Sequence, residues 1–164
     1  MGNVRLPSTG ATRLLQAHKV PYTGHLYRYE EHGGARVAAR ELGVPEHSVV
    51  KTLVMEDDGS QPLLVLMHGD LEVSTRQLAR QIGRRTVRPC SPEVAARHTG
   101  YPVGGTSPFG TRKVLPVYLE RTILELPVVY VNGGSRGFLV ALPPGELARV
   151  LQPTLVDVAI EEDK

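Results

Sequence analysis

The sequence predicts a single α+β domain in which helices flank a mixed or barrel-like β-sheet. About seven short apolar or β-branched segments have the character of strands, and four or five helical segments lie irregularly between them. A regular alternation of strand and helix, which would indicate a doubly wound nucleotide-binding sheet, is missing from the sequence. We therefore expect one compact sheet whose helices pack around it.

The chain has 164 residues, without a fixed-period repeat or a linker, and we expect one domain over residues 1–164. The longest apolar run, residues 62–67, is too short to span a bilayer, and residues 1–10 lack the apolar core of a signal peptide. Because Cys90 is the only cysteine, no internal disulfide can form. These features predict a cytoplasmic protein.

The predicted elements follow from apolar periodicity and from the residues that begin and end helices. The predicted helices run from Ser8 or Thr9 to about Lys19, over 35–42, briefly at 45–48, from Ser74 to Gly83, from Ser91-Pro92 to Gly100, and over about 145–151. The predicted strands are 22–30, 49–56, 62–68, a short extended piece up to Cys90, 114–119, 128–132 and 138–142. Residues after 151 are expected to form a short tail.

In the first half of the chain, each predicted element has a local signal. The first helix must end before Pro21, and Gly43 is a typical stop for the second. Alternation along the first strand places Tyr27 and Tyr29 on one face. The turn residues 57–60 join two apolar runs and predict a hairpin.

In the second half, helix caps are the clearest signals. Ser74 followed by Gln77 is a capping-box pattern, and Gly83 is a plausible helix end. The pair Ser91-Pro92 has the order of an N-cap followed by a first-turn proline, and Gly100 closes that helix.

Five arginines and no acidic residue lie between residues 73 and 92. These arginines are Arg76, Arg80, Arg84, Arg85 and Arg88. Arg76 and Arg80 are one helical turn apart and share a face. The cluster is typical either of a solvated surface or of a track for nucleic-acid phosphates, since the net charge of the chain is only +2.

Conventional catalytic motifs are missing from the sequence. It contains no HExxH zinc motif, no GxSxG nucleophile elbow and no phosphate-binding glycine loop of the usual types. Cys90 precedes a helix, which can lower a thiol pKa, but a lone cysteine is more often a small buried hydrophobe. His68 and Asp70 are better explained by a turn than by a metal site. We therefore expect no metal, no cofactor and no protein nucleophile.

Three further features admit both a structural and a functional interpretation. The glycine-rich loop from Gly104 to Gly110 can aim backbone N–H groups at an anion, or it can be a structural loop. The segment from Asn132 to Gly137 has the composition of a hairpin turn with an exposed arginine. Lys51 lies inside an apolar run, where it is either a solvent-facing strand residue or a functional cation.

In this order and spacing, these three elements resemble the YbaK family of free-standing tRNA-editing proteins. The matching motifs are Val50-Lys51-Thr52-Leu53, Thr99 to Gly110 with Leu115-Pro116, and Tyr130 to Gly137. The family is related to the editing domain of prolyl-tRNA synthetases and has a barrel-like mixed sheet flanked by helices. The resemblance implies hydrolysis of the ester of mischarged tRNA, most simply Cys-tRNA(Pro) or another small amino acid on tRNA(Pro), without a metal or cofactor. The resemblance leaves open whether prolyl-tRNA synthetase is a second partner.

The resemblance also implies which residues form the site. Lys51 is expected to be catalytic together with a tyrosine, for which Tyr29 is chosen over Tyr27. Expected substrate-binding residues are Gly104, Gly105, Thr106, Ser107, Pro108, Gly133, Gly134 and Arg136. The local charge cluster, and not the family pattern, leads to the expectation that Arg76, Arg80, Arg84 and Arg85 bind the tRNA body.

One position departs from the family pattern. Cysteine-specific members carry an acidic residue shortly after the second glycine motif, where this chain has Phe138 and Leu139. The missing carboxylate puts the cysteine preference in question. It also leaves open a rival hypothesis, in which the protein binds tRNA or a synthetase without catalysing a reaction.

Overall fold

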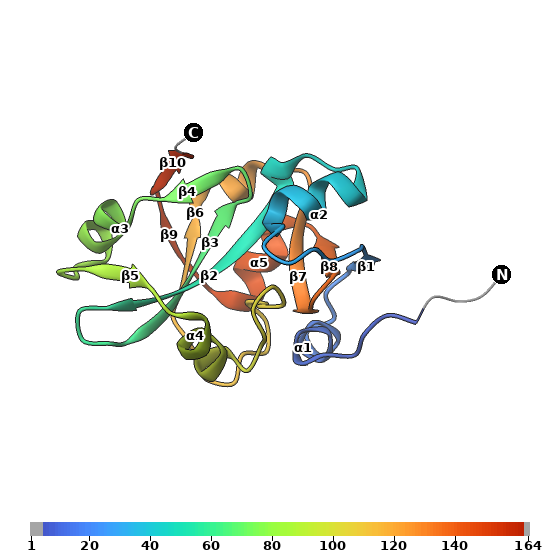
Figure 1. Ribbon diagram of the computed structural model, residues 1–164, viewed down its shortest axis with the longest axis horizontal. Coiled ribbons are helices and arrows are strands. Elements are labelled where there is room, and N and C mark those ends of the chain that lie inside the picture. Colours follow the sequence, from blue (N-terminus) through green and yellow to red (C-terminus); the bar gives the residue numbers. More distant parts are fainter. Residues whose placement is uncertain (1–4, 163–164) are drawn as a thin grey trace.

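An eight-stranded mixed sheet and a separate two-stranded sheet organise the computed structural model, which describes residues 5–162 (Figure 1). Residues 1–4 and 163–164 lie outside the described residues. They include both predicted domain limits and the start of the segment 1–10, which was considered as a signal peptide. The helices are α1 (Gly10–Ala17), α2 (Gly34–Leu42), α3 (Thr75–Ile82), α4 (Pro92–Thr99), α5 (Pro144–Leu151) and the 3₁₀ helices η1 (Glu46–Ser48) and η2 (Arg121–Glu125). The strands are β1 (Thr23–Leu26), β2 (Val49–Asp57), β3 (Pro62–His68), β4 (Leu71–Val73), β5 (Val87–Pro89), β6 (Val117–Glu120), β7 (Val129–Ser135), β8 (Phe138–Leu142), β9 (Thr154–Val156) and β10 (Ala159–Glu161).

Strand β2 is the hub of the main sheet. The strand order is β1-β8-β7-β2-β3-β6-β9, and β5 pairs with β2 outside this path. Strand β2 is antiparallel to β3 and β5 and parallel to β7, so both sheet types meet on it. The mixed α+β fold predicted from the sequence is confirmed. In the described part of the chain the path stays open, because its end strands β1 and β9 do not pair with each other.

The core lies on both sides of this sheet. The larger cluster joins Leu15 of α1 and Leu147 of α5 to Leu66, Phe109 and Phe138, all fully buried. A second cluster packs Leu78 of α3 against Met55, Val65 and Met67 of the β2–β3 hairpin. Burial of this kind is the main favourable term in folding. It fixes β2, which carries Lys51, between the two clusters.

The predicted helix caps are confirmed. The side chain of Thr9 caps α1, and the hydroxyls of Ser74 and Ser91 accept the N–H groups of Gln77 and Val94. Helices α2, α3 and α4 end at glycines with left-handed backbone, namely Gly43, Gly83 and Gly100. Glycine adopts left-handed φ angles with little strain, so a glycine after a helical segment is a reliable sequence signal for the end of the helix.

Three predicted strands have different limits. The strand expected over 128–132 is β7, which continues to Ser135 with an irregularity between Asn132 and Ser135, so that the turn expected over 132–137 is shorter. The strand expected over 22–30 is wrong beyond Leu26, because its partner β8 begins at Phe138 opposite Leu26. One more link, from the N–H of Tyr27 to the carbonyl of Gly137, closes the ladder before Gly137 turns away with a φ of +73°. The strand expected over 114–119 begins only at Val117.

The C-terminal tail is more ordered than the sequence predicted. It forms β9, which is parallel to β6, and β10, which is antiparallel to β4. All three strands that the prediction missed, β4, β9 and β10, have three residues each. Such short segments carry little periodicity, and their strand conformation comes from partners distant in sequence.

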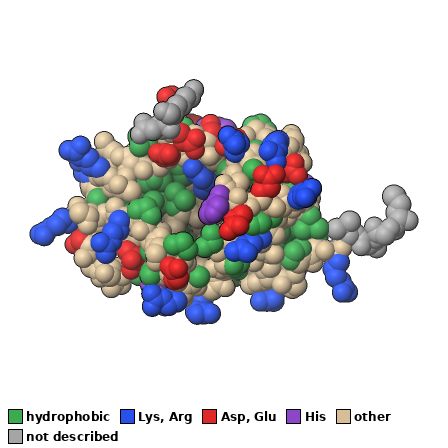
Figure 2. Space-filling view, in the orientation of Figure 1, with side chains coloured by type: hydrophobic (Ala, Val, Ile, Leu, Met, Phe, Trp, Pro, Cys, Tyr) green, Lys and Arg blue, Asp and Glu red, His purple; other side chains and the backbone are tan. Residues whose placement is uncertain are grey.

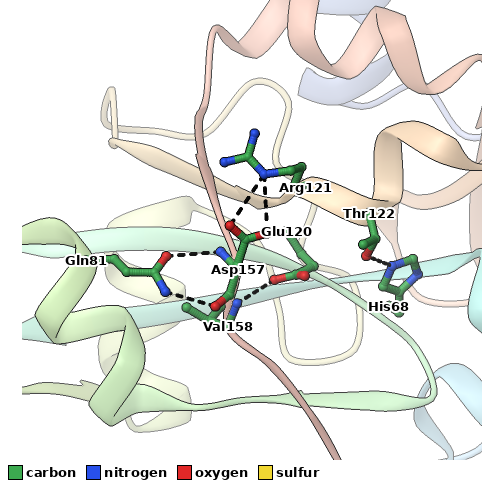
Figure 3. A network of polar contacts seen from close by, with 7 residues as sticks. All are labelled: His68, Gln81, Glu120, Arg121, Thr122, Asp157 and Val158. Carbon is green, nitrogen blue, oxygen red and sulfur yellow. Dashed lines mark hydrogen bonds and ion pairs between the residues drawn. The ribbon is translucent and has the colours of Figure 1, made fainter.

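A polar network fixes this C-terminal segment (Figure 3). The carboxylate of Glu120, only 3% exposed, accepts the N–H of Val158 at 2.7 Å. Gln81 of α3 exchanges two hydrogen bonds of 2.9 and 3.0 Å with the backbone of Asp157. Arg121 pairs with the carboxylate of Asp157 at 3.2 Å. These contacts hold the chain in place just before β10.

Among residues 5–162, no helix combines the length and the apolar character that crossing a bilayer requires.

Phe109 is predicted to anchor the glycine-rich loop in the core. Its ring is fully buried in the larger cluster. Phe109→Ala should therefore lower the free energy of unfolding by about 3–5 kcal/mol, the usual loss for a large aromatic core residue. Urea denaturation monitored by circular dichroism measures this change. Val114→Ala is the control, because Val114 is fully exposed and should change stability by no more than about 0.5 kcal/mol. Equal stability of both variants would show that the loop is not anchored in this way.

Candidate active site

Two adjoining pockets form a groove that crosses β2. The first has a volume of about 630 Å³ and lies beside α2, and the second has a volume of about 510 Å³ and reaches the beginnings of α3 and α4. The residues lining both pockets are Lys51, Thr52, Leu53, Val103, Gly104 and Thr106. Figure 2 shows hydrophobic side chains gathered near the middle of this face, with basic, acidic and histidine side chains beside them. The groove is therefore an apolar trough with a polar rim.

Lys51 lies at the boundary between the two pockets. It is half-buried on β2, opposite Met67 of β3. Its ammonium group donates a hydrogen bond to the carbonyl oxygen of Leu71. Leu71 begins β4, whose sheet partner is β10, the strand that follows the Glu120 network. The position of the ammonium group thus depends on the pairing of β4 with β10, which lies near the C-terminal end of the described residues.

The glycine-rich loop approaches the site from the other side. Gly104 has a φ of +82°, and a Cβ atom there would lie 2.5 Å from the hydroxyl of Tyr29. At Gly105 a Cβ atom would lie 3.0 Å from the backbone nitrogen of Arg136. The left-handed backbone and the Tyr29 contact together favour glycine strongly at position 104, and at position 105 any side chain would have to push the second backbone away. Further along, the Ser107 hydroxyl is buried and accepts the N–H of Phe109 at 3.2 Å.

Asn132 of β7 and Arg136 of the β7–β8 turn join this loop to the β7–β8 hairpin. The amide of Asn132 donates to the carbonyl of Gly104 at 3.1 Å, and its oxygen accepts the N–H of Gly134 at 2.7 Å. The Nε of Arg136 donates to the carbonyl of Val103 at 2.7 Å. The guanidinium carbon of Arg136 also lies 5.5 Å from the centre of the Tyr29 ring, within cation–π range. One wall of the groove is thus built from the glycine-rich loop and the turn end of the β7–β8 hairpin, which are far apart in sequence.

Both tyrosines considered from the sequence line the first pocket. Tyr29 touches Gly104 and Arg136, and so belongs to the contacts that join the two loops. Tyr27 packs against the apolar cluster of Ala38, Val49 and Leu139, and burial raises the pKa of its hydroxyl above the ordinary value. The geometry therefore places Tyr29 nearer to the glycine loop, while Tyr27 remains a second hydroxyl in the same pocket.

The residues expected to bind substrate fall into two groups. Gly104, Thr106 and Arg136 line the first pocket directly. The others line neither pocket, and all of them except Gly134 are buried; these are Gly105, Ser107, Pro108, Gly133 and Gly134. Gly133 and Gly134 allow close packing, since Cβ atoms there would meet the Phe138 ring and Tyr101 at less than 3 Å.

The arginines lie at the end of the molecule formed by α3 and β5, where Figure 2 shows basic side chains along the left edge. Arg76, Arg80 and Arg85 are exposed. Arg84 differs from them, because it pairs with the carboxylate of Asp57 at 2.8 Å. This ion pair ties the helix end to the β2–β3 hairpin and leaves Arg84 less free to meet a phosphate.

Cys90 favours the protonated thiol, whereas a cysteine nucleophile reacts as the thiolate. Burial and the neighbouring carboxylate of Glu56 raise the pKa of its thiol to about 11. The position before α4 does not lower the pKa, contrary to what helix proximity alone suggested. At neutral pH the thiolate is scarcely populated, which disfavours a cysteine nucleophile.

His68 is a buried structural histidine. Its Nδ1 lies 2.8 Å from the carbonyl oxygen of His47, and its Nε2 lies 2.7 Å from the hydroxyl of Thr122. Burial lowers the pKa of the ring. Both nitrogens are therefore occupied, which agrees with the interpretation of His68 and Asp70 as part of a turn.

Several groove residues were not singled out from the sequence. Thr52 lines both pockets, and its buried hydroxyl has no hydrogen-bond partner among the described residues. Glu30 and Glu31 at the rim follow β1 and precede α2. Leu139, only 4% exposed, contributes apolar wall at the position of the missing acid. Asn132 had a signal, because it begins the second glycine motif, but its bond to Gly104 requires the tertiary fold.

The arrangement can stabilise negative charge. Lys51 supplies a cation at the shared wall, and the surrounding groove is largely apolar, which strengthens electrostatic interactions. The glycines allow a substrate to approach the loop backbone closely. Such a site suits a reaction in which an oxyanion develops on a carbonyl or an anionic group must be held.

Comparison with known proteins gives a consistent picture. A profile of the aminoacyl-tRNA editing domain matches residues 30–150. EbsC of Enterococcus faecalis, a candidate Cys-tRNA(Pro)/Cys-tRNA(Cys) deacylase, is 28% identical over 155 residues, covering 94% of each chain. The proline–tRNA ligase of Geobacter metallireducens is 32% identical over 95 residues, which are 58% of this chain and 16% of the ligase. The crystal structure of a candidate trans-editing enzyme for prolyl-tRNA synthetase has a TM-score of 0.78 at 25% identity, covering 96% of this chain and 100% of that chain.

These matches confirm the resemblance stated from the motifs around Lys51, Gly104 and Asn132. The matched profile spans most of the described chain and includes the whole groove wall built by the two loops. This chain belongs to the aminoacyl-tRNA editing domain family.

Proposed function

We propose that this protein is a free-standing deacylase that hydrolyses the ester between tRNA and a wrongly attached small amino acid. The observation that carries the proposal is that Lys51 and Gly104 share the wall between two pockets of one groove. Family membership supports a tRNA ester as substrate, and the relation to proline–tRNA ligases supports tRNA(Pro) as the carrier. Cysteine or another small amino acid is the proposed cargo.

The groove suggests an orientation for this substrate. The first pocket has apolar walls from Val49, Ala38 and Leu139, which suit a small uncharged side chain. The second pocket extends to Val73 and Thr75, where α3 begins. The aminoacyl group would lie in the first pocket, and the tRNA 3′ end would leave through the second toward the exposed arginines. The ester would then lie at the shared wall.

In the proposed reaction, no side chain acts as nucleophile and no metal or cofactor takes part. A positioned water, assisted by the neighbouring ribose hydroxyl, attacks the ester carbonyl, and the amino acid and the tRNA ribose hydroxyl are released. For cysteine, the substrate's own thiol can attack instead, so that the ribose oxygen leaves with the thiol proton and a thiolactone is released. Each route places negative charge on the carbonyl oxygen. The ammonium of Lys51 and the loop backbone stabilise that charge, an effect typically worth about 2.7–4 kcal/mol for one donor.

A second candidate function is binding without catalysis. It is favoured by Leu139, since a leucine cannot orient a substrate ammonium or thiol as a carboxylate would. In this alternative the protein binds tRNA or prolyl-tRNA synthetase and leaves the ester intact. A deacylation assay separates the two functions directly.

Lys51 is predicted to be needed for catalysis and not for folding. Lys51→Ala should reduce deacylation of mischarged tRNA(Pro) at least about tenfold, because the cation facing the ester is removed. Loss of one such charge-stabilising donor typically lowers the rate by about 10²- to 10³-fold, so tenfold is a conservative lower bound. Its melting temperature should stay within a few degrees of that of the natural protein. Lys19→Ala is the matched control, since this exposed lysine is outside the groove. Full activity of Lys51→Ala would remove Lys51 from the mechanism.

The exposed arginines of α3 are predicted to bind the tRNA body. Changing Arg76 and Arg80 together to Gln should weaken tRNA binding and reduce the slope of log K against log salt by about one per lost phosphate contact. Titration at several salt concentrations measures the slope. The control changes Arg13 and Lys19 to Gln, near α1 at the opposite end of the molecule from α3 (Figure 1). Equal slopes for both double variants would mean that the α3 arginines are only a solvated surface.

Leu139 is predicted to make the site less selective for cysteine. Its apolar side chain should accept alanine or serine better, relative to cysteine, than a carboxylate would, although such pockets discriminate by only about 10–200-fold. The test compares Cys-, Ala- and Ser-tRNA(Pro) with the natural protein and with Leu139→Asp. Because Leu139 is buried, Leu139→Asn tests separately whether a polar group at this position disturbs folding. A natural protein that strongly prefers cysteine, with a variant that behaves identically, would contradict the prediction.

A further inference from the structure

Three side chains that commonly bind metals meet beside the second pocket. They are Glu56 of β2, Cys90 just after β5 and His98 of α4, and one ligand atom of each lies within 4.8 Å of the other two. None is freely exposed, and the side chains of His98 and Glu56 are 14% and 17% exposed. Cys90 also lines the second pocket. The cluster therefore combines three chemical types of ligand at a partly buried place that is open on one side.

The fold brings these residues together by strand pairing and a capped helix. Strand β5 is antiparallel to β2, and the N–H of Cys90 continues the ladder by donating to the carbonyl of Val54 at 3.0 Å. The Ser91 cap then begins α4, which returns His98 to β2. The positions are thus set by backbone hydrogen bonds and not by flexible loops, as a preorganised site requires.

The ring of His98 has an unsatisfied atom aimed at this cluster. Its Nε2 is buried without a hydrogen-bond partner among the described residues and lies 3.8 Å from a carboxylate oxygen of Glu56. Buried polar atoms nearly always have a partner, so a missing one requires an explanation. A metal ion between His98, Glu56 and Cys90 would supply the missing contact.

The ligand types identify the class of metal. A thiolate with an imidazole and a carboxylate suits zinc, whereas magnesium and calcium prefer oxygen ligands. Zinc bonds of about 2.0–2.3 Å put tetrahedral ligands roughly 3.3–3.8 Å apart, so the cluster needs only a small contraction. The charges of one thiolate and one carboxylate would neutralise a divalent ion.

We propose that Glu56, Cys90 and His98 form a zinc-binding site whose fourth position faces the second pocket. Binding forms a sulfur–metal bond and releases the thiol proton of Cys90 to solvent. The ammonium of Lys113 lies 3.1 Å from Nδ1 of His98, and this exposed side chain must move away, because zinc on Nε2 leaves a proton on Nδ1. The site does not enter the proposed deacylation. It joins β2, the end of β5 and α4, and so fixes the wall of the second pocket.

Cobalt substitution tests this site with a signal that only Cys90 can give. The chain contains one cysteine, so a sulfur-to-cobalt charge-transfer band in the near ultraviolet must report Cys90. We expect the band to appear on titration of the natural protein with Co²⁺ and to disappear on addition of Zn²⁺. Cys90→Ser and His98→Gln should each lose it. His47→Gln is the matched control and should keep it, because His47 belongs to a separate cluster with His68 and Asp70.

Three results would overturn the proposal. They are the lack of a band in the natural protein, a band that persists in His98→Gln, and a complex in which sedimentation finds two chains for each metal. Circular dichroism of each variant checks its fold. Zinc should also raise the melting temperature of the natural protein and leave that of Cys90→Ser unchanged, and an equal rise in both would count against the site. None of these readouts depends on deacylase activity, so failure here leaves the proposed function intact.

Discussion

The position of one ammonium group organises the candidate site. Lys51 lies on the strand that joins the parallel and antiparallel parts of the sheet, and its charge is directed by the carbonyl of Leu71. A long lysine side chain has many rotamers, and fixing them costs conformational entropy. A strand that is remote in sequence holds the acceptor of this hydrogen bond in place, because β10 pairs with β4, the short strand that carries Leu71. The Glu120 network fixes the chain immediately before β10.

The second constraint is the close approach of two glycine loops. Gly104 and Gly105 bring one backbone against Tyr29 and Arg136, and Asn132 bonds across the junction. Larger side chains at these glycines would separate the loops. The glycine loop therefore presents its backbone to the groove beside Lys51 and Thr52. A largely apolar groove with Lys51 at its centre and Arg136 in one wall is suited to stabilising transient negative charge.

The sequence predicted these parts to different degrees, for physical reasons. Caps such as Ser74, Ser91 and Gly83 are local signals, and the helices they bound were predicted closely. The two glycine motifs and Lys51 were visible as residues, but only the fold brings them to one groove. Strands β4, β9 and β10 could not be predicted, because three residues carry too little pattern and their partners are distant. The Arg84–Asp57 pair and the raised pKa of Cys90 likewise depend on neighbours that the sequence does not place.

Whether the groove cleaves an ester is decided by incubating the purified natural protein with tRNA(Pro) charged in parallel with cysteine, alanine, serine and proline. Enzyme at substoichiometric concentration is mixed with each labelled aminoacyl-tRNA, and the remaining ester is followed over time against spontaneous hydrolysis. An editing deacylase should turn over one or more mischarged species at a rate well above that for Pro-tRNA(Pro). Decay of all four at the spontaneous rate, with tRNA binding retained, would contradict this activity and identify the protein as a binding module of the same fold.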